Sequence, residues 1–124
     1  MKFSRVRTAI LPALILAVAT LAIAADVSGK WTASFETQIG TQTYTYEFKV
    51  DGQKLTGTAK SMNGESAITE GKVTGDDITF VENLNFQDMP LRITYKGKIS
   101  GDEIKFTRDV AGIANEVLVA KRVK

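Results

Sequence analysis

From residue 28 onward, apolar and polar side chains alternate with a period of two, in short runs separated by glycine-containing turns. In the first run, Trp31, Ala33 and Phe35 fall on one side and the residues between them on the other. Such alternation is typical of half-buried β-strands, because successive side chains of a strand point to opposite faces of the sheet. We count eight such runs and no helical periodicity after residue 24, so the sequence predicts an all-β domain.

The turns between the runs repeat a short pattern. Residues 71–80 read Gly-Lys-Val-Thr-Gly-Asp-Asp-Ile-Thr-Phe, and residues 97–106 read Gly-Lys-Ile-Ser-Gly-Asp-Glu-Ile-Lys-Phe. Each copy has the form of a strand end, a tight turn and a strand start, which is a strong hairpin signal. The spacing of 26 residues equals two strands and two turns, as in an up-and-down meander. Eight twisted strands in this order lose their exposed edges by closing, so we predict an eight-stranded antiparallel up-and-down β-barrel.

A meander places alternate turns at opposite ends of the barrel. Three short turns fall at one end, which we expect to be sealed: 50–53, 74–77 and 100–103. The other end receives the turns at 39–42 and 62–65 and two segments predicted to be long loops, 82–90 and 109–115.

The two predicted loops carry apolar residues that solubility alone does not favour. Binding residues concentrate on loops that a rigid scaffold holds, so we predict a ligand-binding site at this end. Its rim residues are predicted to be Asn83, Phe86, Met89, Ile113 and Asn115, with Tyr44 and Tyr46 lining the interior. The alternative interpretation is that the same apolar residues fold inward and plug the barrel.

Residues 1–24 have the features of a cleavable signal peptide. Lys2, Arg5 and Arg7 precede an apolar run that ends in Ala22-Ile23-Ala24, the small-x-small pattern that signal peptidase reads. We predict a single domain over residues 25–124 that is secreted or periplasmic and not attached to a membrane after cleavage. An uncleaved membrane anchor is the alternative, although the run is shorter than the ~20 residues that span a bilayer.

The predicted leader accounts for the net positive charge of the chain. The chain has 16 Lys and Arg and 14 Asp and Glu, a formal net charge of +2. Three of the basic residues and none of the acidic ones precede residue 25, which leaves 13 against 14, or −1. No basic surplus remains to neutralise a phosphate backbone, so we expect no nucleic-acid partner.

The chain contains no histidine and no cysteine. This composition excludes catalytic triads, the common zinc sites, haem held by these residues, and disulfides. Glu70, Glu82 and Asp88 are the remaining candidates for a glycosidase-like carboxylate pair, but their context favours solvated residues. Acidic pairs after the turn glycines fit hairpin geometry better than a calcium loop. We therefore expect no catalysis, no cofactor and no metal.

The start of the first run, Gly29-Lys30-Trp31, resembles the Gly-x-Trp signature of the calycin group, which includes lipocalins, avidins and fatty-acid-binding proteins. In lipocalin-like barrels this tryptophan caps the closed end and a basic residue late in the last strand packs across it. Arg122 matches that position. The passage from Phe48-Lys49-Val50-Asp51-Gly52 to Leu55-Thr56-Gly57-Thr58 is similar to the second and third strands of avidin-type barrels. The resemblance implies a calycin-like barrel over residues 28–123 with Trp31 and Arg122 at its closed end.

Two functional hypotheses remain. The first is an exported, non-catalytic protein that holds a small apolar or amphipathic ligand at the loop-framed end. The alternative is a protein-interaction module of the cell envelope, or an inhibitor of a secreted enzyme, that uses the same loops. The volume of the barrel interior distinguishes the two hypotheses, because an eight-stranded barrel is either filled by its own side chains or has room for one small ligand.

Overall fold

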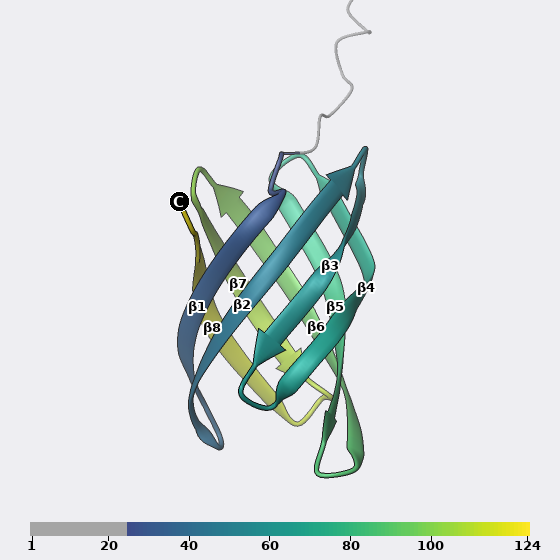
Figure 1. Cartoon of the computed structure of the whole chain (residues 1–124), viewed down its shortest axis with the longest axis vertical. Helices are drawn as coiled ribbons and strands as arrows, with labels where there is room; N and C mark the ends of the chain where they lie inside the picture. Colours follow the sequence, from purple (N-terminus) through teal and green to yellow (C-terminus); the bar gives the residue numbers. More distant parts are fainter. Residues whose placement is uncertain (1–24) are drawn as a thin grey trace, which may run out of the picture.

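In the computed structural model, which describes residues 25–124, eight antiparallel strands close into a barrel in sequence order (Figure 1). The strands are β1 (Gly29–Thr37), β2 (Gly40–Asp51), β3 (Lys54–Ser61), β4 (Gly64–Thr74), β5 (Asp77–Phe86), β6 (Met89–Ser100), β7 (Glu103–Val110) and β8 (Ala114–Arg122). The predicted meander barrel is confirmed. The predicted signal peptide lies outside the described residues. Within residues 25–124 no helix has the length and apolar character needed to cross a bilayer.

The hairpin turns at one end each begin with a glycine. Gly52, Gly75 and Gly101 have φ angles of 64°, 58° and 60°, and one further residue follows each before the next strand begins. Two-residue turns with glycine in the first position match the twist of the flanking strands. Segment 25–28 lies against these turns, since the Ala25 N–H donates to the Gly75 carbonyl at 3.1 Å. We call this end, at the top of Figure 1, the sealed end.

The opposite end, which we call the open end, consists of the turns at 38–39, 62–63, 87–88 and 111–113. The prediction of two long loops here is wrong. Strands β5 and β6 run on until only Gln87 and Asp88 separate them, and β7 and β8 leave only three residues between them. Gln87 and Asp88 both have positive φ, 52° and 64°, which is the geometry of a tight hairpin turn that Asn-Gly pairs usually signal. The segment predicted as a long loop is therefore a β-hairpin formed by β5 and β6. This hairpin extends beyond the other turns of the open end in Figure 1.

Closure between the first and last strands is confined to the sealed end. β1 and β8 share register pairs at Trp31–Arg122 and Thr32–Lys121, whereas β1 pairs with β2 from Gly29 to Thr37. Strands β1 and β8 therefore leave a seam that is unpaired toward the open end.

Trp31 and Arg122 close the sealed end. The Trp31 side chain is fully buried, and its indole N–H donates to the Val27 carbonyl at 2.9 Å. The guanidinium carbon of Arg122 lies 4.5 Å from the indole centroid, in cation–π contact. Arg122 also donates to the carbonyls of Asp26 and Ser28, both at 3.1 Å, so the last strand is tied to the segment before the first.

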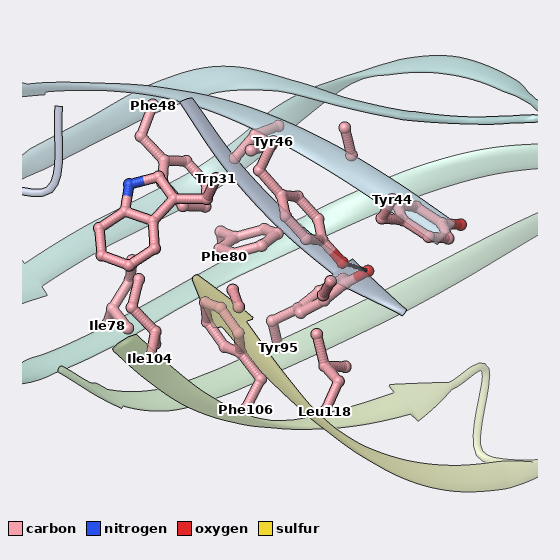
Figure 2. Close-up of a cluster of buried hydrophobic side chains, with 14 of the residues drawn as sticks. Trp31, Tyr44, Tyr46, Phe48, Ile78, Phe80, Tyr95, Ile104, Phe106 and Leu118 are labelled. Atoms are coloured by element: carbon pink, nitrogen blue, oxygen red, sulfur yellow. Dashed lines mark hydrogen bonds between the residues drawn. The ribbon is translucent and has the colours of Figure 1, made fainter. Parts of the chain in front are cut away.

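Aromatic rings fill the middle of the barrel. Phe80 stacks on Tyr95 with ring centroids 4.3 Å apart, and Phe106 meets these rings edge-on at 5.6 and 5.5 Å. Gly97 makes room for this packing, because a Cβ there would lie 2.6 Å from the Phe106 ring. Figure 2 shows Trp31 at one side of the cluster and Tyr44 at the other. Rings therefore occupy the interior between the sealed end and Tyr44.

Candidate functional site

A cavity of about 220 Å³ lies inside the open end. Its rim is formed by side chains at or beside the turns: Ile39, Phe86, Met89 and Ile113. Tyr44 and Ile93 lie furthest from the turns and form its floor. A water molecule takes up ~30 Å³ of the liquid, so the cavity has the volume of about seven waters. This is less than the ~300–1,000 Å³ typical of pockets that enclose a drug-sized molecule, so the cavity suits a small molecule or one end of a larger one.

The two sides of the cavity differ in polarity. The apolar wall comes from β5 and β6 and consists of Leu84, Phe86, Met89, Leu91 and Ile93. The polar wall comes from β2, β7 and β8. It carries the polar side chains of Gln42, Tyr44, Arg108 and Glu116, with Val110 and Ala114 toward the rim. The cavity is therefore amphipathic across its width.

Arg108 is the centre of a buried polar network behind the polar wall. Its side chain is only 5% exposed, although arginine is rarely buried without partners. Its Nε donates to the Tyr95 hydroxyl at 2.8 Å and its Nη2 to the Tyr44 hydroxyl at 2.9 Å. Its Nη1 donates to Glu116. The guanidinium carbon also lies 5.3 Å from the Phe35 ring centroid, so aromatic faces and oxygen acceptors both stabilise the charge.

Glu82 is the second charged group of the network. Its two oxygens accept hydrogen bonds from the hydroxyls of Tyr44, at 2.9 Å, and Tyr95, at 2.8 Å, and one of them lies 3.5 Å from Arg108 Nη2. The hydroxyl of Tyr46 lies 2.9 Å from that of Tyr95 and completes the cluster (Figure 2). The interpretation of Glu82 as a solvated loop residue is wrong, because it follows Phe80 in the inward phase of β5. Its buried charge is compensated on both oxygens.

Burial sets the protonation of the network. It raises the pKa of Tyr44 to about 12, with the negative charge of Glu82 adding to the effect. Burial likewise holds the pKa of Tyr46 and of Tyr95 well above the ordinary value. Burial acts to lower the pKa of Arg108, but the surrounding Tyr95, Tyr44 and Glu82 outweigh it and the pKa is raised. At neutral pH the three phenols therefore keep their protons and Arg108 keeps its charge.

Gln42 is a buried polar side chain with unused hydrogen-bonding capacity. The residue is 5% exposed and lines the cavity, and its Oε1 accepts a hydrogen bond from Asn63 at 3.1 Å. Among residues 25–124 its amide nitrogen has no hydrogen-bond partner. A buried N–H without a partner costs free energy unless water or a ligand satisfies it. This donor is therefore available to a molecule in the cavity.

The structure brings four of the predicted site residues together. Phe86, Met89, Ile113 and Tyr44 line the cavity. Tyr46 is buried in the network behind it. Asn83 and Asn115 are exposed on the outer face of the barrel, where Asn83 donates to Thr69 Oγ1 at 3.1 Å.

The polar cavity residues that the sequence did not predict include Gln42, Arg108 and Glu116. Each lies two positions from a residue that is buried in the barrel, namely Tyr44, Phe106 and Leu118. The phase of the alternation was the available signal, because residues two apart on a strand share a face. Their polar side chains are of the kind expected on the outer face, so the sequence alone does not mark them as cavity residues.

A second, larger hollow of about 1,000 Å³ runs along the outer surface at the seam between β1 and β8. Much of its lining consists of outward-facing residues such as Ser34, Lys105 and Val117. The buried apolar side chains that border it, including Phe35 and Phe106, are at most 6% exposed. The hollow is thus a surface groove. Glu116 borders both hollows, whereas Gln42, Tyr44 and Arg108 line only the smaller cavity.

Comparison of the chain with models of known protein families, with curated proteins and with solved structures finds no match. The closed eight-stranded antiparallel barrel is compatible with a calycin-like architecture. Because one fold carries many functions, the functional argument rests on the cavity and its residues.

Proposed function

We propose that this protein is a non-catalytic binding protein that holds a small apolar or amphipathic molecule at the open end of the barrel. The observation that carries the proposal is the cavity with one apolar and one polar wall, in a barrel whose remaining interior is packed with rings. Ligand sites are typically concave and mostly apolar with a few convergent polar groups, and this cavity has that composition.

The arrangement of the carboxylates supports binding rather than catalysis. Glu82 is buried, with both oxygens engaged by tyrosine hydroxyls. Glu70 is exposed on the outer face and forms a bidentate pair with Arg92, and Asp88 is exposed in a turn. The three carboxylates considered for a glycosidase-like pair therefore do not share one cavity.

Native mass spectrometry of the protein purified from its own host tests this function. We expect a small-molecule adduct on the parent protein and its loss in Phe86→Ser and Ile113→Ser, which place hydroxyls at the apolar rim. Val117→Ser is the matched control, because Val117 is 76% exposed on β8 and does not line the cavity. Ile113 is also 69% exposed, so its substitution should leave the thermal midpoint unchanged. A parent protein that carries no adduct and takes up no apolar probe would contradict the proposal.

Exposed apolar residues at the rim favour the second candidate, a protein-interaction module. Ile39, Met89 and Ile113 are 56%, 60% and 69% exposed at the same end. Such clusters mark contact surfaces as well as the lips of pockets. A bound protein that Ile113→Ser releases, with no small molecule in the cavity, would favour this candidate over the first.

A location outside the cytoplasm is part of the proposal and rests on the sequence of residues 1–24. The intact mass of the exported protein tests it, and we expect the first residue to be Ala25. A membrane-bound product that retains Met1 would overturn it.

A further inference from the structure

We propose that the cavity accepts the hydroxyl end of an uncharged amphiphile and discriminates against carboxylates. This inference rests on the proposed binding function and specifies its ligand class. It follows from the charges behind the polar wall, from two hydrogen-bonding groups on that wall, and from the apolar side chains opposite.

The charge of Arg108 is already offset. Glu82 lies 3.5 Å from its Nη2, and Glu116 accepts a hydrogen bond from its Nη1. Two carboxylates thus face one guanidinium, and the side chains of all three residues are at most 9% exposed. A carboxylate ligand would enter a cluster that already carries an excess negative charge, where the low local dielectric strengthens repulsion.

The excess negative charge does not make the cavity a cation site. Glu82 does not line the cavity, and each of its oxygens is occupied by a tyrosine hydroxyl. The charged groups on the wall itself are Arg108 and Glu116, which neutralise each other. An ammonium group at Glu116 would therefore also face Arg108.

The polar wall offers both a donor and an acceptor. The Gln42 amide nitrogen is a buried donor without a partner among residues 25–124. Glu116 is an acceptor with two oxygens, of which Oε1 bonds Arg108. A hydroxyl both donates and accepts, so it complements these two groups without introducing charge. Leu84, Leu91 and Ile93 on the opposite wall suit the carbon chain that follows it.

The probes that test this are 1-hexanol, hexanoate and hexylammonium, which share one carbon chain and differ in the polar end. Their affinities are measured at neutral pH by amide shifts in NMR titrations, with shifts on β2, β7 and β8 locating the site. We expect 1-hexanol to bind at least tenfold more tightly than hexanoate or hexylammonium. Equal or tighter binding of either ion overturns the inference but leaves the binding function standing. Failure of all three probes to bind overturns both.

Glu116→Gln tests the cause of the selectivity. This variant keeps the shape of the side chain but removes one of the two charges that offset Arg108. We expect the affinity ratio of 1-hexanol to hexanoate to fall at least tenfold in Glu116→Gln. In the control Glu47→Gln, an exposed carboxylate on β2 outside the cavity, the ratio should keep its parent value. A ratio of two affinities on one variant does not depend on the fraction that is folded. An unchanged ratio in Glu116→Gln would overturn the charge argument.

Discussion

Each half of the barrel contains an arginine against aromatic rings, but the two arginines have different partners. At the sealed end Arg122 stacks on Trp31 and donates to backbone carbonyls and to the exposed Asp102. Its side chain is 25% exposed. Behind the open end, the Arg108 side chain is 5% exposed, and within residues 25–124 its guanidinium donates only to other side chains.

The difference separates a contact that closes the barrel from a network of chemically specific side chains. Every residue has a backbone carbonyl, so the contacts of Arg122 with Asp26 and Ser28 do not require particular side chains at these positions. They connect the last strand to the segment before the first strand. The partners of Arg108 are chemically specific groups, and removing any of them leaves a buried polar atom unpaired. The network thus stabilises the barrel and also sets the charge of the cavity wall.

Alkaline pH should have the largest effect, because all three tyrosines of the chain belong to the network. The pKa of each is raised in the folded protein, to about 12 for Tyr44, whereas the unfolded chain releases these protons near pH 10. Their stabilisation is therefore complete below pH 10 and is lost as pH rises toward 12. The combined loss reaches about 4 kcal/mol per pH unit, at about 1.4 for each group.

Urea midpoints between neutral pH and pH 11, with tyrosinate absorbance followed in parallel, measure this loss. Absorbance should rise only as the barrel unfolds. Titration of the phenols near pH 10 in a protein that stays folded would contradict the buried network.

Among single substitutions, Arg108→Met should cost the most, about 3–5 kcal/mol of unfolding free energy, because Glu82 is left buried without an opposite charge. Replacing both members, in Arg108→Met with Glu82→Leu, should recover part of this loss, since the uncompensated charge is then removed. Denaturant melts of the single and double variants provide the measurement. If the double variant is less stable than Arg108→Met, compensation of Glu82 is not the reason for the loss.

Arg122→Ala should cost less, about 1–2 kcal/mol, through lost stacking and packing of the side-chain stem on Trp31. Arg92→Ala is the matched control, because Arg92 is paired with Glu70 on the exposed surface and its loss should leave the urea midpoint at the parent value. If Arg122→Ala lowered the unfolding free energy as much as Arg108→Met, the two arginines would not differ in their contribution to stability, and the contrast between the two ends would be wrong.

The local features of this protein can be predicted from its sequence alone. The alternation and the Gly-Asp turns predicted eight strands, their order and the sealed end, because strand periodicity and hairpin geometry depend on residues close together in the chain. The prediction failed where a local signal was atypical, at the tight turn of Gln87 and Asp88, which adopts positive φ without glycine.

The cavity and the charge of its wall, in contrast, depend on contacts between strands that are distant in the sequence. Tyr44 meets Glu82 across 38 residues of sequence and Arg108 across 64, contacts that exist only when the barrel closes. From the sequence alone, Glu82 and Arg108 would be expected on the surface, because charged residues are rarely buried. Inside the barrel they form an ion pair, because a buried charge is costly without an opposite charge and barrel closure places the two side chains next to each other.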